Sequence, residues 1–280
     1  MTAANDAKLL DRLTETLAAV AGVRAIVLGG SRARGAATEH SDYDIGLYYE
    51  PEKPLNIASL RTAAAALDDR GTEAEVTDIG GWGPWINGGG WLTVAGTRVD
   101  LLYRDLGRVR GVIDECRVGR VACYFQPGHP HGFVSAIYAG EVAVCLPLWD
   151  PHGTLWQLKA LTTPYPAELR RALTKKFIWE AQFAVDNARH GCGPDDVNYV
   201  AGCCFRSVAS LCQVLFALNG EYLLNEKGAV ALADRLPLRP KGFAVRVAAI
   251  YHEAGTGSRT AALDIVQHLL DDTGALLKAA

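Results

Sequence analysis

The sequence has little net charge, because 28 Lys and Arg residues nearly balance 31 Asp and Glu residues over 280 positions. Proteins that bind nucleic-acid polymers present many Lys and Arg side chains to phosphates, so this balance argues against an extended nucleic-acid partner. The formal charge of −3 is also unevenly spread, with −5 in residues 1–150 and +2 in residues 151–280. This difference suits a metal-binding half joined to an anion-binding half.

Paired cysteine motifs are absent as well. The seven cysteines are odd in number, include no Cys-x-x-Cys motif and lie mostly among apolar residues. This usage predicts reduced core thiols of an intracellular protein and argues against a disulfide framework. The cysteines are Cys116, Cys123, Cys145, Cys192, Cys203, Cys204 and Cys212.

Long apolar runs, internal repeats and low-complexity tracts are not found in the sequence. No apolar run approaches the roughly 20 residues that span a bilayer. The N-terminus lacks a basic region leading into an apolar stretch, which argues against a secretory signal. We therefore expect a cytoplasmic protein with no membrane association.

The first half of the chain alternates helical and extended patterns. A length of 280 residues suggests two domains at about 150 residues each. Period-2 runs of apolar residues, separated by glycine-rich turns, predict a mixed sheet with a few helices. The expected helices are 6–20 and 55–70, the expected strands 23–28, 43–49, 73–79, 91–95 and 98–103, and 80–90 is expected to be a Gly/Trp loop.

The second half reads as helical throughout. Apolar residues recur there at helical spacing, and glycine and proline separate the segments. We predict an α+β domain with a mixed sheet at residues 1–128, followed by an all-α helical-bundle domain at residues 129–280. The expected helices are 166–189, 199–218, 226–235, 240–253 and 258–278.

The strongest chemical signal is a pair of acids that begins the strand at 43–49. Side chains alternate along a strand, so Asp42 and Asp44 project from one face while Tyr43 points to the other. Two close carboxylates repel each other unless one is protonated or a cation lies between them. Their hard oxygen atoms suit Mg²⁺ or Mn²⁺, so the pair predicts a divalent metal site.

A glycine-rich turn precedes this acidic pair by eleven positions. Gly29, Gly30 and Ser31 follow an apolar strand, and glycines allow backbone N–H groups to approach phosphate oxygens closely. A third acid, Asp100, alternates with Val99 on a later apolar strand and would join the pair if the two strands are neighbours. Singly, these features fit a turn, a cap or an ion pair of Asp100 with a flanking arginine. Together they predict a metal and phosphate site.

These residues resemble the nucleotidyltransferase superfamily of the polymerase β type. The resemblance covers roughly residues 20–105, and the Gly-Ser-Arg-Ala-Arg-Gly segment at 30–35 looks like the bacterial group that includes aminoglycoside and lincosamide nucleotidyltransferases. It implies transfer of a nucleoside monophosphate, AMP from ATP or another NTP, to a hydroxyl of a small molecule, with release of pyrophosphate. It also implies two Mg²⁺ ions held by Asp42, Asp44 and Asp100, and phosphates held by Gly29, Gly30, Ser31 and either Arg34 or Arg32.

A weaker likeness is found in the second half. Residues 220–229 and 234–237 and a later tyrosine are similar to the helical domain of streptomycin/spectinomycin adenylyltransferases. The resemblance implies that Lys227 and Tyr251 contact the triphosphate. The glutamate base of that subgroup has no clear counterpart, so Asp100 and Glu180 are both candidates. Glu180 also fits an exposed i,i+4 ion pair with Lys176.

Three tryptophans and two histidines have more than one interpretation. Trp82, Trp85 and Trp91 flank the glycine-rich loop and could stack on a base, line an acceptor pocket or pack as a hydrophobic plug. His129 and His131 are too few for a zinc site.

Two other functions stay open, namely nucleotidyl transfer to a protein or tRNA and a non-catalytic nucleotide-binding module, although three carboxylates argue against the module. The oligomeric state is left open.

Overall fold

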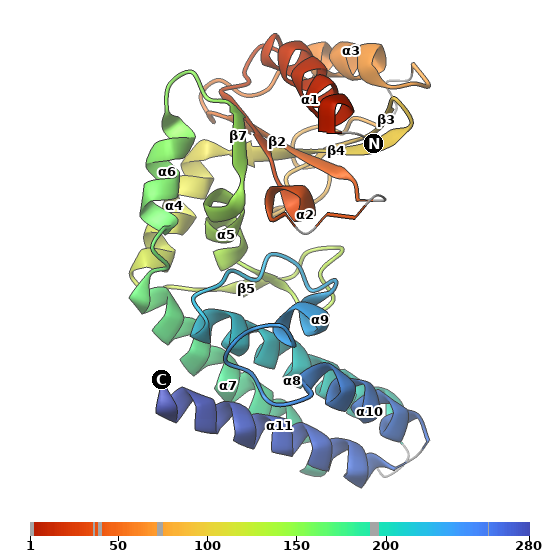
Figure 1. Cartoon of the computed structure of the whole chain (residues 1–280), viewed down its shortest axis with the longest axis vertical. Helices are drawn as coiled ribbons and strands as arrows, with labels where there is room; N and C mark the ends of the chain where they lie inside the picture. Colours follow the sequence, from red (N-terminus) through yellow and green to blue (C-terminus); the bar gives the residue numbers. More distant parts are fainter. Residues whose placement is uncertain (1–2, 36, 39–40, 72–74, 191–195, 257) are drawn as a thin grey trace. The chain divides into compact units, whose positions relative to one another are not determined.

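The computed structural model describes residues 3–35, 37–38, 41–71, 75–190, 196–256 and 258–280 (Figure 1). The chain forms two compact units. Unit 1 comprises Met1–Asp114, Phe125–Gly128 and Tyr138–Pro164, and unit 2 comprises Glu115–Tyr124, His129–Ile137 and Tyr165–Ala280. The units therefore alternate along the chain between residues 114 and 165, which differs from the single boundary after residue 128 that the sequence predicts.

Unit 1 contains a five-stranded mixed sheet in the order β3-β4-β2-β1-β7. β2 and β4 are parallel, and the other neighbouring strands are antiparallel. The sheet confirms the predicted α+β class, but β3 begins inside the expected Gly/Trp loop and β7 was not predicted. The strands are β1 (Ala25–Leu28), β2 (Tyr43–Tyr49), β3 (Gly89–Val94), β4 (Thr97–Asp105) and β7 (Leu146–Trp149).

The two faces of this sheet differ in polarity. One face buries Ile45 and Leu47 of β2 against helices α1 (Ala3–Ala18) and α3 (Ile57–Leu67), which lie together on one side of the sheet (Figure 1). Alternation along the strands sends Asp44, Asp100 and Arg104 to the opposite face, named here the polar face. Helix α5 (Ala136–Val144) contacts it, because its Glu141 pairs with Arg104.

One predicted strand is not formed. Residues 75–79 make only an isolated bridge, between Val76 and Gly90, while 73 and 74 lie outside the described residues. Four helices of the first 165 residues are also not among the expected ranges. They are α2 (Gly30–Ala33), α4 (Leu106–Arg117), α5 and α6 (Thr154–Thr162).

Unit 2 is mainly helical, as predicted. Helices α7, α8, α10 and α11 pack around a core that includes Val185, Leu211 and Val266 (Figure 1). The described helices are α7 (Ala167–His190), α8 (Val197–Leu218), α9 (Ala229–Ala233), α10 (Phe243–Gly255) and α11 (Arg259–Ala279), and a small hairpin is formed by β5 (Cys123–Tyr124) and β6 (Phe133–Val134).

Helix α8 corrects the expectation that no segment approaches a membrane-spanning length. Among the described residues, this helix alone is long and apolar enough by length and composition to cross a bilayer. Of the 18-residue apolar segment of this helix, 67% is buried inside the structure, which is typical of the core helix of a soluble protein. The apolar sequence is thus used in packing of the helical unit.

The described cysteines are all free thiols, and most are buried. Cys116, Cys145, Cys204 and Cys212 lie in the interior, as expected for core thiols, whereas Cys123 is exposed. Cys192 lies outside the described residues.

A carboxylate at the C-terminus of α3 holds the outer hairpin of the sheet. Asp68 is buried, and its two oxygens accept hydrogen bonds from Arg70 Nε and Nη2 at 2.9 and 2.8 Å. The N–H of Thr93 on β3 donates to the same carboxylate at 3.2 Å. The side-chain hydrogen bond from Arg70 holds the pKa of Asp68 at about 2. This ionised carboxylate therefore joins α3 to β3.

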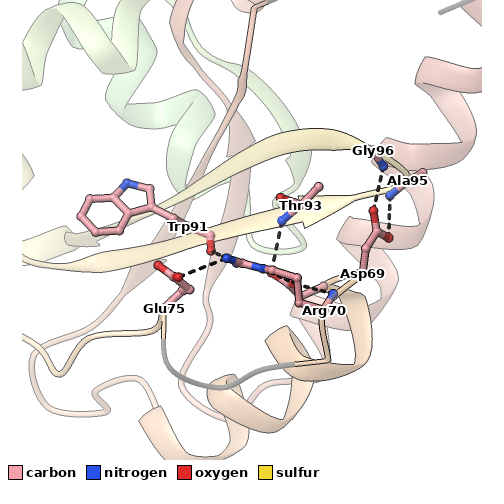
Figure 2. Close-up of polar contacts among 8 residues, drawn as sticks. Asp69, Arg70, Glu75, Trp91, Thr93, Ala95 and Gly96 are labelled. Carbon is pink, nitrogen blue, oxygen red and sulfur yellow. Dashed lines mark hydrogen bonds and ion pairs between the residues drawn. The ribbon is translucent and has the colours of Figure 1, made fainter.

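The neighbouring acid holds the turn between β3 and β4. Figure 2 shows Asp69 facing the backbone N–H groups of Ala95 and Gly96, which donate to it at 3.0 and 2.8 Å. Arg70 reaches the opposite way, to Glu75 and to the carbonyl oxygen of Trp91. Three consecutive side chains after α3, those of Asp68, Asp69 and Arg70, thus fix the position of β3 at the edge of the sheet.

We predict that Asp68→Asn lowers the free energy of unfolding by about 1–2 kcal/mol at pH 7, because charge-assisted hydrogen bonds are lost. Since the folded pKa lies below the unfolded value, this stabilisation is complete above about pH 4 and is lost as the pH falls towards 2. Urea unfolding at pH 7 and pH 3 should show the difference between wild type and variant shrinking in acid. Asp264→Asn, in a surface pair with Arg189, should change stability by less than about 0.5 kcal/mol. A difference independent of pH would contradict the assignment.

Candidate active site

The glycine turn after β1 leads directly into a short helix. Gly30 has a φ of +61° and begins α2, where the sequence predicts a tight loop. The N–H of Gly29 donates to the carbonyl oxygen of Asp44 at 2.7 Å. That donor is already used in the sheet, and the phosphate contact of Gly29 stays a prediction from the resemblance. The N–H groups of Gly30 and Ser31 lie in the first helical turn, where they have no partner within the helix.

Gly30 and the Asp44 carboxylate are in direct contact. A Cβ atom added at Gly30 would lie 1.7 Å from Asp44 Oδ2. Both the positive φ and this contact require glycine at the position. The turn and the carboxylate, which the sequence separates by fourteen positions, thus form one site.

The predicted acids of β2 and β4 are brought together. Asp44 and Asp100 are register partners on the parallel strands β2 and β4, so both side chains lie on the polar face. Burial raises the pKa of Asp44 to about 6, and the charges of Asp100, Asp42 and Glu141 add to this rise against the opposing charge of Arg32. Burial and the Asp42 charge also raise the pKa of Asp100. The site therefore concentrates negative charge in a half-buried position.

The donor set fits a divalent cation in its chemistry. Burial and neighbouring carboxylates disfavour the ionised form of Asp44, and a cation between Asp44 and Asp100 would offset that repulsion. Asp42 instead pairs with the exposed guanidinium of Arg98 at 2.7 Å. Across the described ranges, no group of three or more His, Cys, Asp and Glu side chains is arranged to hold a metal ion. Asp42 would thus have to exchange Arg98 for the cation.

The two arginines of α2 differ in their surroundings. Arg32 donates to the carbonyl oxygens of Ser41 at 2.7 Å and Asp42 at 3.2 Å, and its guanidinium lies 3.8 Å from the centre of the Tyr43 ring. It therefore holds the start of β2. Arg34 is half-buried at the end of α2 and remains the predicted phosphate contact.

A buried ion pair beside the acids was missed at the sequence level. Arg104 is 4% exposed and donates Nε and Nη2 to the two oxygens of Glu141 at 2.7 and 2.6 Å. Burial alone lowers the pKa of Arg104, but the charge and hydrogen bonds of Glu141 outweigh it and raise the pKa. Two signals could have found the pair. Arg104 follows Asp100 by four strand positions, and Glu141 is the one charged residue of the segment 132–149.

The predicted base Glu180 lies in unit 2 and is buried on α7. The hydrogen bond with His131 Nε2, at 3.2 Å, lowers the pKa of Glu180, and the nearby charge of Arg206, 2.8 Å away, acts in the same direction. The expected exposed pair with Lys176 is therefore wrong, because Glu180 points into the unit. A carboxylate with a lowered pKa is also a weaker base than an ordinary one.

Lys227 and Tyr251 also belong to unit 2. Lys227 is exposed, and its backbone N–H donates to Asn225 Oδ1 at 2.9 Å. Tyr251 lies on α10, and burial, with the thiols of Cys204 and Cys212, raises its pKa to about 12. Their contact with a triphosphate stays a prediction from the resemblance.

Comparison with known proteins identifies the N-terminal part. Residues 8–82 match the model of the nucleotidyltransferase domain, and this range includes Gly30, Ser31, Asp42 and Asp44. A nucleotidyltransferase-like protein from Exiguobacterium sibiricum 255-15 has 12% identity and a TM-score of 0.42, with coverage of 94% of this chain and 75% of that chain. A search of the curated proteins found no match. Residues 8–82 are thus similar to a nucleotidyltransferase domain, and the protein is an enzyme of the transferase class.

Proposed function

We propose that the enzyme moves a nucleoside monophosphate, AMP from ATP in the simplest case, to a hydroxyl of a small molecule and releases pyrophosphate. The observation that carries the proposal is the contact between Gly30 and the Asp44 carboxylate. It joins a turn suited to phosphates to a carboxylate pair suited to Mg²⁺. The near-neutral charge favours a small acceptor over a nucleic-acid polymer. The resemblance favours a hydroxylated antibiotic such as an aminoglycoside or lincosamide. The free cysteines favour a cytoplasmic setting.

The chain's own residues divide into phosphate-binding and acidic groups. The hydroxyl of Ser31, the amides of Gly30 and Ser31 and the Arg34 side chain would hold the β and γ phosphates. Asp42, Asp44 and Asp100 would hold two Mg²⁺ ions, which neutralise charge on the triphosphate and polarise its α-phosphorus when bound.

The transfer releases the proton of the acceptor hydroxyl, and an acid of this site would accept that proton. An oxygen–phosphorus bond forms between the acceptor hydroxyl and the α-phosphorus, and the bond from the α-phosphorus to the pyrophosphate oxygen breaks. Asp100 would accept the hydroxyl proton, because its pKa is raised by burial and by Asp42. The lowered pKa of Glu180 makes it the weaker candidate.

Two measurements test the proposal. Calorimetric titration of the full chain with each NTP, with and without Mg²⁺, should show Mg²⁺-dependent binding of at least one nucleotide. Incubation with α-labelled NTP and a panel of aminoglycosides, lincosamides, tRNA and cell protein should label a small molecule. Label on tRNA or protein instead would establish the alternative acceptor class. Nucleotide binding without any transfer across the panel would favour a non-catalytic module.

We predict that Gly30→Ala lowers Mg²⁺-dependent pyrophosphate release by about 100-fold, because the new methyl group displaces the carboxylate of Asp44. Gly35→Ala is the matched control. Its φ of +66° is equally unfavourable for alanine, but no atom lies within 4 Å of the added Cβ. It should cost about 1 kcal/mol of stability and little activity. Equal losses in the two variants would show that backbone strain alone is responsible.

A further inference from the structure

The polar face continues beyond Asp100 onto the edge strand β3. Trp91 is the register partner of Asp100 in the antiparallel pair of β3 and β4, and directly opposed residues of such a pair project from the same face. The Trp91 side chain is also accessible, since the residue is 52% exposed. An exposed indole therefore lies next to the candidate metal-binding carboxylates.

A second indole extends this surface. The Trp82 and Trp91 rings stack with centroids 4.6 Å apart and planes 24° apart. Trp82 lies over Gly89, because a Cβ atom added there would be 2.6 Å from its Cζ3. Only glycine leaves room for the ring at this position. We name the stacked pair the indole platform.

The indole platform has a fixed base. The carbonyl oxygen of Trp91 accepts from Arg70 Nη2 at 3.1 Å, and its N–H donates to the carbonyl of Glu75 at 3.2 Å. Figure 2 shows the indole pointing away from the Arg70 guanidinium. The third tryptophan of the loop, Trp85, is buried and packs against Tyr138 and Arg108. Trp85 is therefore structural, whereas Trp91 offers an open ring face.

The strand order shows on which side of the candidate metal-binding carboxylates the indole platform lies. Across the polar face, the phosphate turn follows β1, Asp44 is on β2, Asp100 is on β4 and Trp91 is on β3. Neighbouring strands are about 4.8 Å apart, so β3 lies roughly 14 Å from β1, on the far side of Asp100. In an in-line transfer the acceptor oxygen and the leaving pyrophosphate lie on opposite sides of the α-phosphorus. The platform is thus on the acceptor's side.

We propose that the indole platform binds the acceptor through the flat face of a ring, aromatic or saturated, that carries or adjoins the reacting hydroxyl. The inference rests on the proposed function, since that function defines the acceptor's side. Stacking on an indole favours flat rings and gives no advantage to an open-chain polyol. Trp91 is then a specificity-determining residue.

The test uses the full chain without nucleotide, so that it does not depend on transfer activity. Binding of 4-hydroxybenzyl alcohol, methyl β-D-glucopyranoside and sorbitol is measured by saturation-transfer difference NMR. The two ring compounds distinguish an aromatic from a saturated acceptor, and sorbitol is the open-chain control. Trp91→Ala should weaken binding of the preferred ring compound about tenfold, and Trp91→Phe should retain most of it. Trp156→Ala, which removes another exposed indole of unit 1, should have no effect.

Several outcomes would overturn the proposal. They are equal binding by wild type and Trp91→Ala, tighter binding of sorbitol than of either ring, and no ring binding at all. A nucleobase as the occupant would also overturn it, and would appear as weaker binding of Mg·ATP, but not of Mg²⁺ with inorganic tripolyphosphate, to Trp91→Ala. If wild type binds a ring compound and no nucleotide, the proposed function fails by itself. The melting temperature and the Trp91→Phe variant show whether a loss of binding reflects loss of fold.

Discussion

Replacement of Asp44 by Asn is expected to reduce Mg²⁺-dependent pyrophosphate release by at least about 1,000-fold, or roughly 4 kcal/mol of transition-state stabilisation. Asn preserves the shape of the side chain and its contact with the Gly30 turn, but it removes the charge that would hold the cation. Because the same change removes repulsion from Asp100 and Asp42, the free energy of unfolding should stay equal or rise slightly.

The measurement compares pyrophosphate release and urea unfolding in the same preparations. Asp11→Asn is the matched control, because Asp11 is an exposed acid on α1 and undergoes the same loss of one charge. It should retain wild-type release. An Asp44→Asn variant that keeps more than a tenth of the activity would show that Asp44 does not hold a catalytic metal. A variant that loses its fold would contradict the expected effect on stability.

The carboxylates could be predicted because a strand has a simple period. Alternation assigns Asp44 and Asp100 to a polar face as soon as their apolar neighbours are assigned to the core. The parallel pairing of β2 and β4, which makes them register partners, is not encoded in either segment. The pairing depends on contacts between segments more than fifty residues apart. From the sequence we could therefore say only that Asp100 joins the acidic pair if the two strands are neighbours.

Helix α5 and strand β7 are elements that the local sequence pattern does not predict. Apart from Glu141, the segment that forms α5 is apolar, so its sequence does not distinguish a buried helix from a buried strand. β7 has only four residues and joins the sheet by pairing with β1, a partner more than a hundred positions away. The pairing of Glu141 with Arg104 depends on this same long-range arrangement.

The hydrogen bond of Gly29 could not be predicted from the sequence. The sequence identifies glycines that can present amides to a phosphate, but it does not say which of these donors the fold already uses. Gly29 donates to Asp44, while Gly30 contacts the carboxylate of the same residue. Two adjacent glycines therefore have separate tasks, one in the sheet and one at the site.

Arg104→Met should lower the free energy of unfolding by about 3 kcal/mol, because it leaves the carboxylate of Glu141 without its partner in a low-dielectric region. The guanidinium is almost fully buried, whereas 26% of the Glu141 side chain is exposed. Some water reaches the orphaned carboxylate, which places the effect at the lower end for buried pairs. Arg24→Met is the control, since Arg24 and Glu50 form a half-exposed pair at 3.1 Å worth less than about 1 kcal/mol.

A double-mutant cycle separates loss of the pair from loss of packing. Glu141→Leu removes the orphaned charge, so the double variant Arg104→Met with Glu141→Leu should recover more than half of the stability lost by Arg104→Met alone. Urea unfolding at pH 7 measures all four proteins. Additive effects of the two substitutions would mean that the Arg104 side chain acts only by filling space. Strong coupling would show that the ion pair holds α5 against the polar face, beside the carboxylate of Asp44 whose pKa Glu141 helps to raise.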